Sequence, residues 1–164
     1  MTVTLVRDLR RDDWPAVLAI YEDGIRSGDA TFETETPSWE DWAAAHPRLR
    51  LVAERDGSVV GWAALSPASP RRCYCGVGEV SVYVAEEARG EGLGHTLLEG
   101  LVEASERAGY WTLTAGVLPE NEASLRLHGA CGFREVVLRK RLAELRGVWR
   151  DVILLERRST LVGT

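Results

Sequence analysis

Hydrophobic and polar residues alternate along the chain with two periods, one typical of strands and the other of helices. The chain opens with a short strand pattern at 3–9, and apolar residues then recur at helical spacing over 14–25, behind Asp12 and Asp13, which can cap and charge the first turn of a helix. A second, shorter helix is expected at 38–46, where Ser38 can serve as the N-cap. The segment between these two helices is predicted to be a loop.

The middle of the chain predicts a hairpin, a surface loop and a further strand. Residues 49–66 form two apolar runs around Asp56 and Gly57, a dipeptide favoured in two-residue turns. Prolines and glycines interrupt the pattern at 67–78, which indicates a loop of the kind that often carries binding groups. In 79–85 valines alternate with other residues, as in a strand with two different faces.

The carboxy-terminal half continues with the same two periods. The patterns predict a leucine-rich helix at 93–109, a strand at 111–118, a helix at 121–131 and two paired strands at 133–145 and 148–158. Strands outnumber helices and cluster, so the fold class is mixed α/β, with one twisted sheet flanked by helices. The sequence has no internal repeat and no low-complexity linker, and we expect a single domain at 1–158 followed by a tail at 159–164.

Composition and charge fit one compact domain and exclude several classes of protein. Of the 164 residues, 45% are hydrophobic and 27% are charged, as in an ordinary globular domain. The formal net charge of -5 opposes the broad basic surface that nucleic-acid binding requires. No apolar run approaches the roughly 20 residues that cross a bilayer, and the charged amino terminus does not resemble an export signal. We therefore expect a cytoplasmic protein without nucleic-acid or membrane partners.

The cysteines give no sign of a disulfide framework or a metal site. Their number, three, is odd, and the chain is predicted to be cytoplasmic, which argues against disulfides. Cys73 and Cys75 have no histidine ligands nearby in the sequence, so their spacing is a poor zinc signal. No metal is expected.

The segment EARGEGLGHTLLEGL, residues 87–101, has glycine at three alternate positions where a strand pattern gives way to a helix. Such glycines let several backbone N–H groups turn toward one point beside the positive end of the helix dipole, which suits a phosphate. A dinucleotide fingerprint would need glycine at His95, and a P-loop would need a lysine that this segment lacks. The alternative is that Gly90, Gly92 and Gly94 only permit a tight turn and close helix packing.

The strand VSVYVA, followed by Arg-x-x-Gly-x-Gly at the start of a leucine-rich helix, resembles the acyl-CoA signature of the GNAT superfamily of N-acyltransferases. The resemblance extends from about Leu5 to Arg157. It implies about seven strands and about four helices, with two neighbouring strands that splay at a bulge to form the acyl-CoA cleft. It also implies acetyl-CoA as co-substrate. The residues implied to hold it are Val82, Tyr83, Val84, Arg89, Gly90, Glu91, Gly92, Leu93, Gly94, His95, Asn121 and Ser124.

Acyl transfer to an amine requires removal of a proton from the substrate ammonium and protonation or stabilisation of the leaving thiolate. Glu79 begins the strand, and His128 shares a helix face with Asn121 and Ser124. Taken alone, a glutamate at a strand end is more often solvated, and a histidine on a helix is more often packed or at the surface. For Asn121, a role as helix N-cap has the same weight as a role in coenzyme binding. GEVSVYV and NEASLRLHGACGF together are similar to the enzymes that acetylate phosphinothricin and methionine sulfoximine. This similarity implies that Glu79 is the general base and that His128 is either a second base or the acid for the thiolate.

The same resemblance implies where the acceptor binds. The loop GDATFETETPS is similar to the loop that places Phe32 and Glu33 near the acceptor. An amino-acid substrate also needs a cation for its carboxylate, and arginine can bind both oxygens. The subgroup has roughly Phe-Arg-x-Arg before a tyrosine, and when counted back from Tyr74 only Arg71 falls on an arginine position.

The sequence therefore predicts an acetyl-CoA-dependent N-acetyltransferase that acts on a small amino-acid-like amine such as phosphinothricin or methionine sulfoximine. Another small amine or a protein amino terminus is the alternative acceptor. A noncatalytic acyl-CoA-binding sensor is the alternative from another class of protein, and the presence of Glu79 and His128 favours the enzyme. The resemblance also allows a homodimer.

Overall fold

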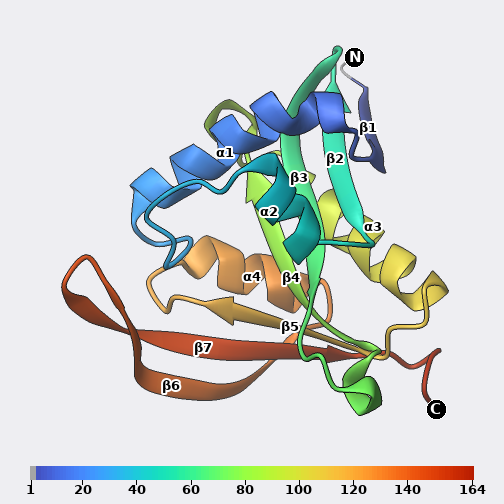
Figure 1. Cartoon of the computed structure of the whole chain (residues 1–164), viewed down its shortest axis with the longest axis vertical. Helices are drawn as coiled ribbons and strands as arrows, with labels where there is room; N and C mark the ends of the chain where they lie inside the picture. Colours follow the sequence, from blue (N-terminus) through green and yellow to red (C-terminus); the bar gives the residue numbers. More distant parts are fainter. Residues whose placement is uncertain (1–2) are drawn as a thin grey trace.

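A seven-stranded sheet with helices on both faces organises the computed structural model, which describes residues 3–164 (Figure 1). Its strands and helices follow in the order β1 (Thr4–Asp8), α1 (Trp14–Ser27), α2 (Trp39–Ala45), β2 (Arg50–Arg55), β3 (Ser58–Pro67), β4 (Val77–Val84), α3 (Leu93–Arg107), β5 (Thr112–Val117), α4 (Glu122–Ala130), β6 (Arg134–Leu145) and β7 (Val148–Arg158). Short 3-10 helices lie at η1 (Arg11–Asp13), η2 (Arg72–Tyr74) and η3 (Glu86–Ala88). This architecture confirms the predicted fold class.

Local signals in the sequence account for most element ends. Ser38 accepts a hydrogen bond of 3.1 Å from the amide of Asp41 and so caps α2. Asp56 and Gly57 have φ angles of 50° and 79°, as the tight turn between β2 and β3 requires. Gly109, with a φ of 91°, follows the end of α3. Each of these positions agrees with its prediction.

The predicted cap of α1 is wrong. The Asp13 side chain makes no capping bond to the helix. Its carboxylate instead accepts bonds of 2.8 and 2.9 Å from the Arg7 guanidinium and one of 2.7 Å from the amide of Arg10. The bonds from Arg7 hold the pKa of Asp13 below its usual value, despite the opposing effect of burial. Asp13 therefore joins the chain segment before α1 to β1.

The sheet has the strand order β1-β2-β3-β4-β5-β7-β6, and the pairing of β4 with β5 is parallel. These two strands pair only from Val77 with Thr112 to Glu79 with Thr114. Beyond Glu79, β4 stays paired with β3 as far as Val84, whereas β5 stays paired with β7. The two strands diverge because each follows its antiparallel partner, and the splayed strands agree with the predicted fold.

The bulge expected at the splay is absent from this pairing. Residues 61–67 of β3 pair with residues 78–84 of β4 without any shift in register. The splay therefore arises from the short contact between β4 and β5 rather than from an extra residue in β4.

The core lies on both faces of the sheet. On the face covered by α1 and α2, Trp42 of α2 packs against Trp62 of β3 with their ring centroids 5.3 Å apart. Only 2% and 1% of their surface is exposed. On the opposite face, the α3 residues Leu97, Leu98 and Leu101 are fully buried. Trp39 is half-buried against the same aromatic cluster, so these three tryptophans belong to the core or pack against it.

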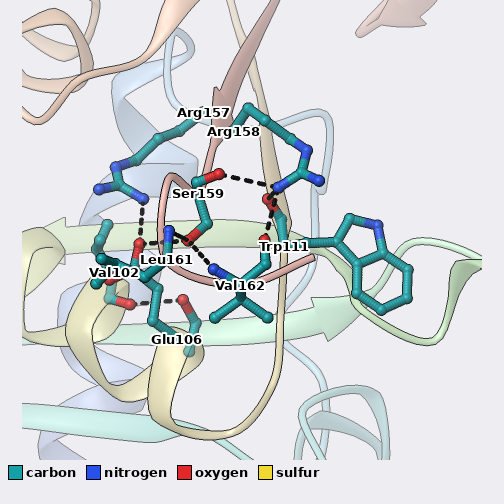
Figure 2. A network of polar contacts seen from close by, with 9 residues as sticks. Val102, Glu106, Trp111, Arg157, Arg158, Ser159, Leu161 and Val162 are labelled. Atoms are coloured by element: carbon teal, nitrogen blue, oxygen red, sulfur yellow. Dashed lines mark hydrogen bonds and ion pairs between the residues drawn. The ribbon is translucent and has the colours of Figure 1, made fainter. Parts of the chain in front are cut away.

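The last residues form neither helix nor strand, yet polar contacts hold them to the body of the protein (Figure 2). Glu106 of α3 accepts bonds of 2.9 Å from both Arg157 and Ser159. Arg158 donates to the carbonyl oxygens of Trp111 and Val162, at 3.2 and 2.8 Å. Within residues 3–164, no helix has the length and hydropathy needed to span a membrane.

Candidate active site

A cavity of about 750 Å³ borders the part of β4 that lies beyond its pairing with β5. One wall is the strand Val82–Val84, the second is the glycine-containing loop with the start of α3, and the third is α4. Of the residues predicted to hold acetyl-CoA, this donor cavity is lined by Val82, Tyr83, Val84, Arg89, Gly90, Gly92, Leu93, Gly94, His95, Asn121 and Ser124.

The loop before α3 has a geometry that suits an anion. Gly90 and Gly92 have φ angles of 77° and 80°, in the left-handed region that favours glycine. The first bond of α3 runs from the amide of Thr96 to the carbonyl of Gly92, at 3.1 Å, so the amides of residues 93–95 precede the helical ladder. No atom lies within 4 Å of a Cβ built on Gly90 or Gly92, so the space beside the loop is open. The residues present fit the pyrophosphate of coenzyme A.

Two residues of the glycine-rich segment have other contacts. A Cβ on Gly94 would lie 3.1 Å from Leu127 Cδ2, so this glycine also allows α3 and α4 to approach. Gly94 therefore has a packing role and also lines the donor cavity. Glu91 does not line the donor cavity, because its carboxylate is paired with Arg55 of β2.

A second cavity, of about 380 Å³, adjoins the first. The two cavities share Ala30, Val82, Tyr83, Asn121 and Ser124. The second cavity is also lined by Glu79, His128 and Phe32, and its floor comes from β5 and β7. The structure thus brings both predicted catalytic residues to one space beside the donor cavity, and we call this space the acceptor cavity.

Glu79 lies at the point where β4 and β5 separate. Its side chain is accessible to solvent, but the protein around it still desolvates the carboxylate and raises its pKa. It forms no ion pair with any residue in 3–164. A carboxylate with a raised pKa and no cationic partner is a stronger base than an ordinary glutamate.

His128 is buried on α4, with 5% of its surface exposed. Its Nδ1 lies 2.7 Å from the carbonyl oxygen of Ser124. A carbonyl oxygen only accepts, so the neutral ring carries its proton on Nδ1 and leaves Nε2 as an acceptor. Burial lowers the pKa of His128, although the bond to Ser124 opposes this effect. The ring is therefore neutral at pH 7.

Asn121 and Tyr83 connect the two cavities to the loop after α1. The Asn121 side chain accepts a bond of 3.1 Å from the Ser124 amide and donates one of 3.2 Å to the Asp29 carbonyl. It is thus the predicted N-cap and also a tether for the loop. The Tyr83 hydroxyl donates to the carbonyl of Ala30, and burial raises the pKa of this phenol.

Three of the four predicted acceptor residues lie outside the acceptor cavity. Phe32 lines it, whereas Glu33 is exposed and does not. Arg71 and Tyr74 are exposed on the loop between β3 and β4, with the guanidinium 5.5 Å from the centre of the tyrosine ring. Gly76 of this loop packs against the Trp111 ring, which leaves no room for a Cβ, and none of residues 67–78 lines the acceptor cavity.

Sequence reasoning missed the contribution of β6. Arg139 and Leu142 both line the acceptor cavity. The register between β6 and β7 shifts between Arg139 and Ala143, and Arg141 has a φ of 47°. No pattern in the sequence marks this bulge, because the run Arg139-Lys140-Arg141 resembles any solvated strand face.

A metal site is not evident in the part of the chain that the structure describes. No group of three or more histidine, cysteine, aspartate or glutamate side chains in residues 3–164 could hold a metal ion.

Comparisons with known proteins agree with this geometry. The model of the acetyltransferase (GNAT) family matches residues 4–133. Phosphinothricin N-acetyltransferase of Alcaligenes faecalis is 39% identical over 95% of this chain and 81% of its own length. L-methionine sulfoximine/L-methionine sulfone acetyltransferase of Pseudomonas aeruginosa is 32% identical over 92% of each chain. A GNAT superfamily phosphinothricin acetyltransferase of Sinorhizobium meliloti, solved in complex with AcCoA, has a TM-score of 0.89 and 28% identity, covering 98% of this chain and 90% of that one.

The family match covers most of the chain, and the relatives align over nearly its whole length. The glycine-rich loop, the splayed strands and the cavity between them lie in the matched region. Both curated relatives are named as acetyltransferases, so the sensor alternative is not supported. The chain belongs to the GNAT family of acetyltransferases and is an acetyl-CoA-dependent N-acetyltransferase.

Proposed function

We propose that this enzyme transfers the acetyl group to the primary amine of a small amino-acid-like acceptor, with phosphinothricin and methionine sulfoximine as the first candidates. The acceptor cavity carries the proposal: at about 380 Å³ it suits a small molecule, and it places Glu79 and His128 beside the donor cavity. The names of two relatives support the same class of acceptor.

Glu79 is proposed to be the general base. An ammonium cannot attack a thioester until it loses a proton, and a carboxylate with a raised pKa is suited to accept that proton. The proton passes from the acceptor nitrogen to a Glu79 oxygen, directly or through one water molecule. The nitrogen lone pair then attacks the thioester carbonyl.

His128 is proposed to be a second base rather than the acid for the thiolate. Its Nδ1 proton is committed to the Ser124 carbonyl, so a neutral ring has no second proton to donate. The lowered pKa also disfavours the doubly protonated ring that an acid role would need. The acceptor atom Nε2 can instead take up a proton relayed from the amine.

The donor is proposed to bind through the backbone. The amides of residues 93–95, at the positive end of α3, would hold the pyrophosphate of coenzyme A. The open edge of β4 at Val82–Val84 would pair with the amide-containing pantetheine arm, as an added strand does. Coenzyme A supplies the activated acetyl thioester, and the protein holds and orients it.

A homodimer stays a prediction. The edge strand β6 and the neighbouring β7 expose Val137, Leu138 and Trp149, with 47%, 46% and 59% of their surface accessible. Exposed apolar residues on an edge strand support contact with a second copy of the chain.

A thiol-release screen tests the proposed acceptor class. The screen would supply acetyl-CoA with amino acids, their sulfoximine and phosphinic analogues, polyamines and short peptides. We expect turnover with the amino-acid analogues. Turnover confined to polyamines or peptides would contradict the proposed acceptor.

The Glu79→Gln variant tests the proposed base. The amide cannot accept the proton, so we expect kcat to fall by about 100-fold or more, while the dissociation constant for acetyl-CoA stays within about twofold. In the wild-type enzyme, log(kcat/KM) should fall as pH drops through the raised pKa of Glu79, and this limb should be missing from the residual activity of the variant. Full activity in Glu79→Gln would remove Glu79 from the mechanism.

A further inference from the structure

We propose that Arg139 binds the anionic group of the acceptor, so that the acceptor cavity selects a zwitterion with its ammonium at Glu79 and its carboxylate at Arg139. This inference rests on the proposed function and adds to it a residue that sets acceptor specificity. In this proposal Arg139 binds the substrate carboxylate, the role that the sequence predicted for Arg71.

The charges that line the acceptor cavity fit a zwitterion. Among its lining residues, Glu79 has the one carboxylate and Arg139 the one guanidinium, and these two groups have opposite charges. His128 also lines it, but its lowered pKa keeps the ring neutral at pH 7. The other lining residues are apolar or uncharged. An amino acid presents one positive and one negative group, and the cavity offers one partner for each.

The Arg139 guanidinium is available to a ligand. It forms no ion pair and no side-chain hydrogen bond with residues 3–164. Two other arginines of this hairpin are committed: Arg134 pairs with Glu156 at 2.6 Å, and Arg150 pairs with Asp29 at 2.9 Å. Arg139, by contrast, lines the acceptor cavity and has its full side-chain hydrogen-bonding capacity free.

The bulge in β6 explains how Arg139 reaches the cavity together with Leu142. In a regular strand, residues three apart point to opposite faces of the sheet. Here Arg139 pairs with Val152 and Ala143 pairs with Arg150, so three residues of β6 face a single residue of β7. Within the bulge the regular alternation of side chains is interrupted, and Arg139 and Leu142 line the same cavity.

Asp151 holds this bulge in place. Arg141, the bulge residue with a φ of 47°, donates its backbone amide to Asp151 Oδ1 at 2.8 Å. Asp151 is the single β7 residue opposite the bulge. A charged hydrogen-bond acceptor stabilises the strained backbone of the bulge in one conformation. The hairpin therefore holds Arg139 in a defined position.

Arg71 is a poorer candidate for the same anion. It lies on the exposed loop between β3 and β4, where its guanidinium covers the Tyr74 ring, and it lines neither the donor nor the acceptor cavity. The planar fork of Arg139 can bind both oxygens of a carboxylate or two oxygens of a phosphinate. Both groups occur in the acceptors considered above.

Steady-state kinetics of Arg139→Met against two probes test the inference: L-methionine sulfoximine and its carboxamide, which keeps the amine and loses the negative charge. Arg139→Met should raise the KM for L-methionine sulfoximine about 10- to 100-fold, the worth of a charge-assisted pair. The KM for acetyl-CoA and the kcat/KM for the carboxamide should stay within about twofold. Arg139→Lys should restore part of the loss, since it keeps the charge without the fork.

Lys140→Met is the matched control, because it removes the neighbouring positive charge from the same strand at a residue that lines neither cavity. Its kinetics should resemble those of the wild type. A second readout is the rise in Tm that L-methionine sulfoximine produces in the presence of coenzyme A, which should be present in the wild type and lost in Arg139→Met.

The two proposals fail in different ways. If Arg139→Met affects the amino acid and the carboxamide equally, or leaves both unchanged, the inference is overturned while the acetyltransferase activity stands. If the wild type neither acetylates L-methionine sulfoximine nor shows a Tm shift with it, and instead acetylates amines without an anionic group, the proposed acceptor class fails and the inference with it.

Discussion

Backbone conformation at single glycines decides whether the donor cavity can form. Gly92 combines a φ of 80° with an open position at the mouth of α3. A side chain at Gly92 would have two effects: it would strain the backbone, whose φ lies in the left-handed region, and it would intrude on the space beside the amides of residues 93–95. Gly57 in the β2–β3 turn has a φ of 79° and equally open surroundings, so a side chain there causes strain alone.

Gly92→Ala and Gly57→Ala therefore form a matched pair. Both should lower the free energy of unfolding by a similar amount, about 1 kcal/mol, measured by urea denaturation. Only Gly92→Ala should weaken acetyl-CoA binding, by about tenfold or more in isothermal titration calorimetry. Equal acetyl-CoA affinity in the two variants would argue against the loop as the pyrophosphate site.

At the residue scale, the sequence predicts which kinds of side chain the site needs, but it predicts less well which individual residues line the cavity. Strand order, helical spacing and family resemblance predict Glu79, His128 and Phe32 as site residues, and the structure brings all three to the acceptor cavity. Arg71 lies outside this cavity and Arg139 lines it, a difference that the sequence does not reveal because an arginine on a loop and one on an edge strand look alike until the chain is folded. The tautomer of His128 likewise depends on a carbonyl that only the folded helix brings near.

At the scale of elements, the β6–β7 hairpin positions the loop after α1 that carries Phe32. Arg150 of β7 donates a hydrogen bond of 3.0 Å to the carbonyl oxygen of Gly28 and one of 2.9 Å to the carboxylate of Asp29. It also contacts Glu120, just before α4, at 3.2 Å. One half-buried guanidinium thus ties the hairpin, the loop and the start of α4 together beside both cavities.

Arg150→Met should release this loop. We expect faster amide hydrogen exchange in residues 28–33 and a several-fold higher KM for the acceptor, with kcat less affected. Arg134→Met is the control, since Arg134 lies in the same hairpin and its pair with Glu156 is more exposed. If the two variants show the same exchange in residues 28–33, Arg150 does not hold the loop.

Element ends could be predicted because their signals are local. Ser38, Gly57, Gly109 and Asn121 act through chain neighbours, and each was found where the sequence placed it. The splay of β4 from β5 and the bulge in β6 depend on which strand each partner follows, and no local signal carries that information. The splay was expected through resemblance, and the bulge was not expected at all.

For the whole molecule, the polar contacts in Figure 2 fasten the chain end to the helix that begins at the donor cavity. Burial alone would raise the pKa of Glu106, but bonds from Arg157 and Ser159 outweigh it and lower the pKa below the ordinary value of 4.5. A carboxylate with a lowered pKa stabilises the fold when it is charged. Its contribution is full above pH 4.5 and is lost as pH falls through the folded pKa.

Glu106→Gln should therefore destabilise the protein in a pH-dependent way. At pH 7 we expect a loss of about 1–3 kcal/mol and a Tm lower by about 2–10 °C, because Arg157 and Ser159 lose their charged acceptor. As pH falls below the lowered pKa of Glu106, the two proteins should converge in Tm, measured by differential scanning calorimetry. Glu103→Gln, in an exposed pair with Arg107 on the same helix, should change Tm little at either pH. A constant difference at all pH values would contradict the role of the charge.

The short pairing between β4 and β5 leaves the edge of β4 from Val80 to Val84 without a strand partner on that side. A donor molecule bound along this edge completes the sheet, so folding and donor binding are thermodynamically linked. At a free donor concentration of about 100 times Kd, the linkage adds about 2.7 kcal/mol to the free energy of unfolding. The abundance of this enzyme in a cell should then follow the supply of its donor, since a shortage would raise the fraction of unfolded chains open to proteases.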